Sequence, residues 1–214
     1  MKWNLQKLGG IAALIEAAVY VFGFGLFLIV LDAPEYVGPA ERVAFLVDTQ
    51  AVLYFGNLLI YVVFGAVLVV LTLALHERLK AGAPAIVQVA TSFGLIWAGL
   101  VIASGMIANI GMATVIDLYS TDPDQAASLW LAIGTVQEAL GGGNEIAGGL
   151  WVALLSLAAW RMDELPRTLN YLGGVVGLAG ILTVVPNVDV LAAVFGLGQI
   201  VWFAWLGIVM LRRP

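Results

Sequence analysis

The amino-acid sequence predicts an all-α protein, a polytopic membrane helical bundle with six transmembrane helices and both termini on the cytoplasmic side. Three observations predict this fold class. Of the 214 residues, 62% are hydrophobic and only 11% are charged, whereas about 25% of residues are charged in a typical soluble domain. Apolar runs of membrane-crossing length recur along the chain, and basic residues gather in alternate connections. One integral membrane domain, residues 1–214, accounts for the whole sequence.

The apolar runs define the predicted spans, because a membrane helix needs about 20 apolar residues. They are residues 7–31, 50–75, 84–112, 126–160, 169–185 and 190–211. The first run exceeds the roughly 7–15 apolar residues of a signal peptide, so we expect it to be retained. The fifth is short and glycine-rich, and we expect it to tilt or to thin the bilayer locally.

The first long connection joins the first two spans. Pro34, Gly38 and Pro39 interrupt regular structure near its start. The following stretch, "AERVAFLVDTQ", mixes apolar and charged residues. We expect it to form a short helix at the outer interface that leads into the second span, with an early start of the second membrane helix as the alternative.

The fourth span begins with a clear helix signal. Asp122 suits the N-cap, Pro123 the first helical position and Gln125 the third. A helix from Pro123 to Trp160 would be about 55 Å long, whereas a bilayer with its headgroups is about 40–45 Å thick. The helix must therefore tilt, protrude or break, and residues 141–143, all glycine, are the expected place for a break.

Basic residues predict the orientation, because those near span ends are retained in the cytoplasm. In a six-span topology, eight of the nine basic residues share one side, namely Lys2, Lys7, Arg78, Lys80, Arg161, Arg167, Arg212 and Arg213. The opposite connections are acidic and hold Asp32, Glu35, Glu41, Asp48, Asp117, Asp122, Asp124 and Asp189, with Arg42 as the single basic residue. We therefore expect a bacterial inner-membrane protein with both termini in the cytoplasm.

Polar residues inside the predicted spans are the candidate binding or proton/ion-relay residues. They are Glu16, Glu138, Asn144, Glu145 and Gln199. A charged carboxylate at bilayer depth costs about 3 kcal/mol or more, which disfavours exposure to lipid. Glu145 lies midway between Trp130 and Trp160, and interfacial tryptophans at both ends would place it near mid-membrane.

Glu138 and Glu145 are seven residues apart, so an unbroken helix would project them to one face. Asn144 lies beside that face, and the nearby glycines would let another helix approach closely. We expect this face to point into the bundle, towards Glu16 and Gln199. If the membrane ends near residue 141, Glu138 is instead an ordinary interfacial residue.

No basic residue lies inside a predicted span, so the sequence offers Glu16 and Glu145 no internal counter-charge. Because burial disfavours the ionised form, we expect at least one of the two to carry a proton at neutral pH unless a cation lies between them. Isolated amides in membrane helices often only join helices, at about 0.6 kcal/mol each. That structural interpretation stands beside the functional one for Asn57, Gln88, Asn109 and Gln199.

Several classes of site are excluded or unsupported. The chain has no cysteine and a single histidine, His76 at the edge of the second span, so thiolate and multi-histidine metal sites are excluded. Phosphate-binding and dinucleotide-binding motifs and a metallopeptidase histidine pair are missing, as is a basic patch for nucleic acid. We expect no cofactor and no metal.

The segment "WRMDELPRTLNYLGGVVGLAG" at residues 160–180 resembles a bacterial multi-spanning integral membrane family catalogued as a domain of unknown function. The pattern is an aromatic-ended fourth span followed by Leu165, Pro166, Arg167, Leu169, Leu172 and Gly173. The opening "KLGGIAALIEAAVYVFGFGLF" is similar to the first span of that family. The resemblance implies a helical inner-membrane domain and supplies no activity.

Three functions remain open from the sequence. The first is a small transporter or ligand/ion-binding protein with a buried carboxylate site at mid-membrane. The second is a non-catalytic accessory subunit that packs through glycine-rich helix faces against itself or another membrane protein. The third, an intramembrane lipid- or quinone-handling enzyme, has the least support. Membrane lipids are expected partners, with a homo-oligomer as a further expectation.

Overall fold

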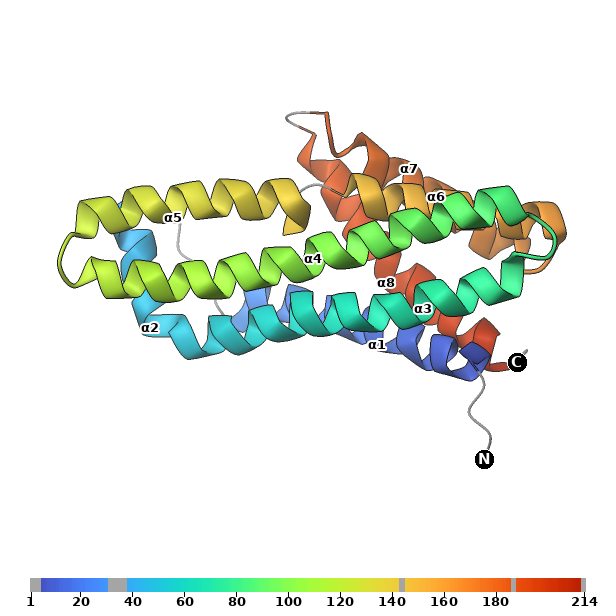
Figure 1. Cartoon of the computed structure of the whole chain (residues 1–214), viewed down its shortest axis with the longest axis horizontal. Coiled ribbons are helices and arrows are strands. Elements are labelled where there is room, and N and C mark those ends of the chain that lie inside the picture. Colours follow the sequence, from blue (N-terminus) through green and yellow to red (C-terminus); the bar gives the residue numbers. More distant parts are fainter. Residues whose placement is uncertain (1–4, 31–37, 143–144, 186–187, 213–214) are drawn as a thin grey trace.

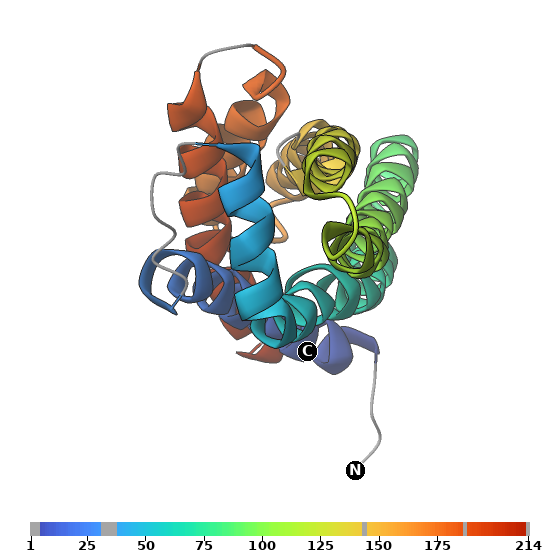
Figure 2. The same ribbon diagram turned by 90° about the vertical axis from the view of Figure 1, so that its left-hand side faces the viewer.

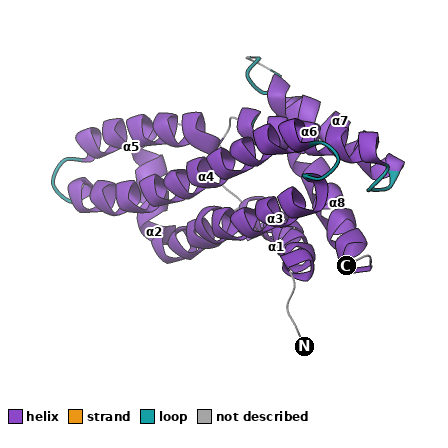
Figure 3. Cartoon of the chain, turned by 45° about the vertical axis from the view of Figure 1, so that its right-hand side comes forward, coloured by secondary structure: helices purple, strands orange, loops and turns teal. Residues whose placement is uncertain are grey.

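The computed structural model describes residues 5–30, 38–142, 145–185 and 188–212, and it is entirely helical over these ranges apart from short connections (Figure 1 and Figure 3). Eight α-helices and three π-helical segments follow in order: α1 (Leu5–Gly25), η1 (Leu26–Val30), α2 (Pro39–Asn57), η2 (Leu58–Val63), α3 (Phe64–Leu79), α4 (Pro84–Tyr119), α5 (Pro123–Gln137), η3 (Glu138–Gly142), α6 (Ile146–Met162), α7 (Arg167–Leu182) and α8 (Asp189–Arg212).

Four of the helical stretches that the structure describes are long and apolar enough to cross a membrane. They are Leu5–Leu28, Glu41–Leu79, Pro84–Tyr119 and Val190–Arg212. The apolar helix α6 is shorter, with 17 residues, and α7 has 16. At 1.5 Å per residue, α6 and α7 each reach only about 25 Å. Helix α6, which is the second part of the predicted fourth span, and α7, which is the predicted fifth, are therefore each shorter than a full crossing of the hydrocarbon layer.

The predicted fourth span is two helices. The segment α5–η3 ends at Gly142, and α6 begins at Ile146. Glu145 between them has φ −104° and ψ 19°, outside the helical range. The predicted break is confirmed, one or two residues beyond the glycines expected to make it. The predicted start is confirmed too, because the Gln125 backbone N–H donates to the Asp122 carboxylate at 3.0 Å.

The second membrane helix starts early. Helix α2 begins at Pro39 and continues through η2 into α3, so the expected separate interfacial helix is not found and the alternative, an early start of the second helix, is the one that the structure shows. Figure 2 shows the first part of α2 lying across the end of the molecule where α4 and α5 are seen end-on. The third predicted span starts at Pro84 as expected, but α4 continues to Tyr119.

Two hydrophobic cores hold the helices together. The larger core joins α1, α3, the first part of α4, α6, α7 and α8. The smaller core joins α2, the last part of α4 and α5, with Leu26 from η1. The two chain ends lie at the larger core's end of the molecule, and the α4–α5 connection lies at the opposite end (Figure 1). The connections predicted to be basic and those predicted to be acidic therefore lie towards opposite ends of the long axis.

Glycine allows the closest helix pair. A Cβ atom added at Gly149 of α6 would lie 2.6 Å from the Gly177 carbonyl oxygen and 2.6 Å from the Ile181 nitrogen of α7. Such distances leave no space for a side chain, so the expected close approach along the glycine-rich face is confirmed.

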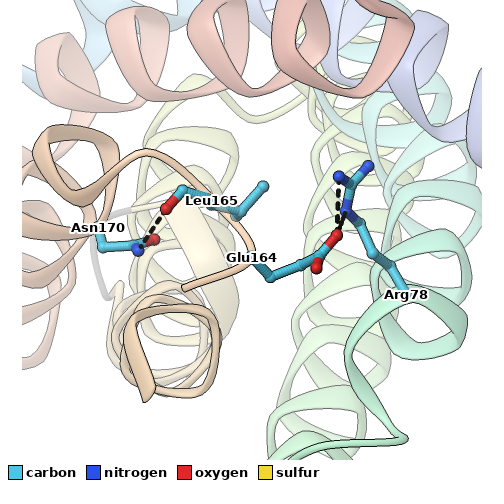
Figure 4. A network of polar contacts seen from close by, with 4 residues as sticks. All are labelled: Arg78, Glu164, Leu165 and Asn170. Atoms are coloured by element: carbon cyan, nitrogen blue, oxygen red, sulfur yellow. Dashed lines mark hydrogen bonds and ion pairs between the residues drawn. The ribbon is translucent and has the colours of Figure 1, made fainter. Parts of the chain in front are cut away.

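One ion pair ties the end of α3 to the α6–α7 connection. An Arg78 guanidinium nitrogen lies 2.9 Å from a carboxylate oxygen of Glu164 (Figure 4). Nearby, the Asn170 amide donates to the Leu165 carbonyl oxygen at 3.2 Å and fixes the start of α7. These contacts anchor the short α6–α7 pair to the long helices.

Candidate functional site

A cavity of about 370 Å³ lies between the ends of the molecule, where the two hydrophobic cores meet. Its wall is formed by α1, η1, η2, the beginning of α3, the middle of α4 and the residue that precedes α6. Half of its twelve lining residues are aromatic: Tyr20, Phe24, Phe27, Tyr61, Phe64 and Trp97. Among the described residues that line it, Glu145 alone is charged.

Two of the three π-helical segments line this cavity. Segment η1 contributes Phe27 and Leu28, and η2 contributes Ile60 and Tyr61. Segment η3 precedes the break that ends at Glu145. A π-helical turn holds an extra residue and widens the helix locally, and such turns are frequent at functional sites. Two π-helical segments and one helix break therefore contribute residues to the wall of one cavity.

The helix break places the Glu145 side chain in the cavity wall. The Glu145 backbone N–H donates to the Thr183 hydroxyl at 3.1 Å, and that hydroxyl donates to the Gly180 carbonyl oxygen at 2.8 Å. The Glu145 carbonyl oxygen accepts from the Gly149 N–H at 2.7 Å. Helices α6 and α7 thus hold this backbone on both sides, which leaves the side chain to face the cavity.

The half-buried Glu145 carboxylate forms no hydrogen bond or ion pair with any residue in the described ranges. It lies at the start of α6, where the helix dipole favours a negative charge. The site is therefore a carboxylate without a protein counter-charge, in a mainly aromatic space.

A second polar contact fixes the cavity wall. The Gln137 amide donates to the Tyr61 hydroxyl at 3.2 Å, and the Ser104 hydroxyl donates to the Gln137 carbonyl oxygen at 3.1 Å. Helices α4 and α5 thus position a tyrosine that belongs to η2. The sequence analysis did not identify Tyr20 or Tyr61, because aromatic residues in apolar spans are most often packing or interfacial residues.

The five predicted site residues occupy different environments. Glu16 and Gln199 are both 0% exposed, and the part of the chain that the structure describes gives their side-chain oxygen and nitrogen atoms no hydrogen-bond partner. Glu138 is exposed and Glu145 lines the cavity. Asn144 lies outside the described residues. The expectation that Glu138 and Glu145 share a helix face does not hold, because the helix is broken between them.

Tyr20 connects the first helix with the break. It lies close enough to Glu16 and Glu145 to interact electrostatically with both. Its ring packs against Phe64 at 5.5 Å and Phe203 at 6.2 Å between centroids. The two carboxylates expected to meet inside the bundle thus lie in different places, Glu16 in the packed core and Glu145 at the cavity, and both are within electrostatic range of Tyr20.

Three deep tryptophans have no polar partner for the indole nitrogen among the described residues. Trp97, Trp151 and Trp202 form a ladder with ring centroids 5.8 and 5.6 Å apart. Their indole nitrogens are buried without a hydrogen-bond partner within the described ranges. Aromatic packing is thus their main contribution.

Metal binding finds no support in the described residues, which contain no group of three or more His, Asp or Glu side chains suited to a metal ion. His76 lies in the last turn of α3, where its Nδ1 atom is 2.8 Å from the Thr91 hydroxyl. It joins α3 to α4 at the end of the molecule and does not line the cavity.

Comparison with known proteins finds no matching protein-family model, no matching curated protein and no matching solved structure. The function is therefore inferred from the chemistry of the cavity.

Proposed function

We propose that the protein is a ligand-binding membrane protein of the transporter type, in which a small molecule occupies the cavity beside Glu145. One observation carries the proposal: the Glu145 carboxylate, which has no partner among the described residues, lies at a helix break and lines a cavity of about 370 Å³. Transporters place substrate sites at discontinuous helices near the middle of the membrane. The volume also lies within the roughly 300–1,000 Å³ range of small-molecule sites.

The proposed topology has six membrane segments, with α6 and α7 as the two short ones and both termini in the cytoplasm of a bacterium. The positions of the charges support this orientation. Lys80, Arg161 and Arg212 lie towards one end of the long axis, and Asp117 and Asp122 lie at the other. Basic residues mark the cytoplasmic side of membrane proteins.

The accessory-subunit alternative loses its main support. Five of the six glycines of α6 and α7 pack inside the chain, as when Gly148 meets Trp97 and Gly149 meets Gly177, and Gly174 alone of these six has open space beside it. The enzyme alternative needs convergence of His76 with the carboxylates, and His76 lies at the far end of α3.

Cysteine labelling tests the proposal, because the native chain contains no cysteine. Gly23 lines the cavity, and a Cβ atom there would lie 3.5 Å from Ile60, an ordinary contact. In liposomes, we expect N-ethylmaleimide to modify Gly23→Cys. Ala13→Cys, at a position that is 0% exposed, should resist modification, and Ala81→Cys in the α3–α4 connection should react fully.

Equal resistance of the Gly23→Cys and Ala13→Cys variants would contradict an accessible cavity. A folding control is required, so each variant is compared with the native chain by size-exclusion chromatography and thermal unfolding. Modification of a natively folded Gly23→Cys variant supports the proposal.

A further inference from the structure

We infer that the cavity binds an organic cation, an alkylammonium or quaternary ammonium group whose charge pairs with Glu145. The inference rests on the proposed function, since it assigns a chemical class to the molecule in that cavity. Three features of the site carry it: the aromatic wall, the unmatched negative charge and the apolar rim.

The wall has the composition of a cation–π site. Cations bind the faces of Trp, Tyr and Phe rings with about 0.5–2 kcal/mol each, and quaternary ammonium groups are held in aromatic cages. Six of the twelve lining residues are aromatic. The rings of Phe64 and Trp97 pack edge-to-face at 5.5 Å between centroids, and Tyr20 packs on Phe64 in the same way. The aromatic wall is therefore fixed by its own packing.

The charge of the cavity selects a cation. Glu145 has no positive partner among the described residues, and the described lining contains no Lys, Arg or His. A bound anion would lie against the carboxylate, and a neutral molecule would leave it without a counter-charge. An organic cation supplies the missing charge in a region of low dielectric, where the attraction is strong.

The rim selects an apolar cation over a metal ion. Phe27 is 45% exposed and Leu28 is 71% exposed at the cavity edge. A calcium ion needs about 6–8 oxygen ligands. The lining side chains supply only the Glu145 carboxylate and the hydroxyls of Tyr20 and Tyr61. A substituted ammonium has the apolar surface that this rim and wall accommodate.

Acidic residues lie at the outer end of the proposed topology, on the same side of the larger core as the cavity rim. Glu41, Asp48, Asp117, Asp122 and Asp124 are exposed there, with Arg42 as the one basic residue that the structure describes at that end. Such an excess of one sign raises the local concentration of the opposite ion. Cations are therefore attracted to the outer end of the proposed topology.

A matched pair of ligands tests the inference. Benzyltrimethylammonium and neopentylbenzene have the same shape and differ in charge. Binding to the purified full chain is measured by calorimetry in dodecyl maltoside, a detergent with neither charge nor ammonium group. We expect benzyltrimethylammonium to bind at least about tenfold more tightly than neopentylbenzene, a difference of about 1.4 kcal/mol. Glu145→Gln should remove this preference.

Glu138→Gln is the matched control, because it removes one carboxylate at an exposed position seven residues away and should leave the affinity nearly unchanged. Equal affinity for the two compounds would overturn the cation inference and leave the ligand-binding proposal intact. No binding of either compound, together with an unreactive Gly23→Cys variant, would overturn both.

Two kinds of molecule carry such an ammonium group: a free amine, and a lipid with an ammonium headgroup. Short-chain phosphatidylcholine and phosphatidylglycerol are therefore added separately to the same assay. Competition by phosphatidylcholine alone identifies a lipid headgroup as the occupant. Binding of benzyltrimethylammonium without such competition identifies a free cation.

Discussion

The Gln137 amide donates a hydrogen bond to the Tyr61 hydroxyl at 3.2 Å, so a tyrosine of the cavity wall is held by the neighbouring helix α5. Tyr61 also lies within the electrostatic range of Glu145. This contact couples the end of α5, just before the helix break, to the π-helical segment that widens the second membrane helix.

Two substitutions distinguish the contribution of the Tyr61 hydroxyl from that of the Tyr61 ring. Tyr61→Phe keeps the ring but leaves the half-buried Gln137 amide without its acceptor, so we expect a loss of about 1–3 kcal/mol in the free energy of unfolding. Affinity for benzyltrimethylammonium should be nearly unchanged. Tyr61→Leu removes the ring and should weaken cation binding by about 2- to 30-fold. Calorimetry and thermal unfolding measure the two effects, and equal cation affinity in both variants would exclude a role for the ring.

Helix α7 offers a matched pair of glycines for testing the helix packing. A Cβ atom at Gly177 would lie 2.7 Å from the Gly149 carbonyl oxygen, whereas one at Gly174 would meet nothing within 4 Å. Gly177→Ala should therefore lower the free energy of unfolding by about 1–3 kcal/mol through overpacking. Gly174→Ala should be neutral or stabilising by about 0.5–1 kcal/mol. Thermal unfolding in detergent checks the order, and equal stability of the two variants would contradict the close packing of α6 and α7.

Asn57 and Asn109 join the second and third long helices. The Asn57 amide donates to the Asn109 side-chain oxygen at 3.0 Å, and the Asn109 amide donates to the Tyr54 carbonyl oxygen at 3.1 Å. A double-mutant cycle with Asn57→Ala and Asn109→Ala should give a coupling energy of about 0.6–1.7 kcal/mol, the range for such bonds in membranes. Additive effects of the two substitutions would mean that this hydrogen bond contributes nothing.

Glu16 costs stability in the packed core. It is 0% exposed, and within the described ranges neither carboxylate oxygen has a hydrogen-bond partner. Replacing it with Leu removes a buried polar group that is not hydrogen-bonded, so Glu16→Leu should raise the free energy of unfolding by about 1–3 kcal/mol. Thermal unfolding of this variant beside Glu16→Gln checks the expectation. A large loss of stability in Glu16→Leu would show that the carboxyl group is bonded in the native protein.

Part of the fold follows directly from local sequence signals. Asp122 and Pro123 define the start of α5, and Pro84 marks the start of α4. The glycines near residue 142 weaken the helix where it breaks. The actual lengths of the membrane helices are less predictable, because α4 continues through apolar residues to Tyr119, and hydropathy alone does not say where an apolar helix leaves the bilayer.

Only one central residue of the candidate site could be predicted from the sequence. Glu145 stands out as a carboxylate in an apolar segment, and the structure places it at the cavity. Its neighbours there come from α1, η2 and α4, and their convergence depends on helix packing that no local pattern encodes. Glu138 follows the same sequence pattern but is exposed, because the break removes the helical phase that would have related the two.

Modification by dicyclohexylcarbodiimide tests most directly whether Glu145 faces an accessible apolar cavity. This apolar reagent attacks carboxyl groups in their protonated form, so the reaction is run at acidic pH, where Glu145 takes up a proton, and mass spectrometry of the digested protein locates the product. We expect modification at Glu145, slowed by benzyltrimethylammonium, and none at Glu16, which is packed in the core. An unmodified Glu145, or modification of Glu16 in its place, would contradict a ligand site beside the helix break.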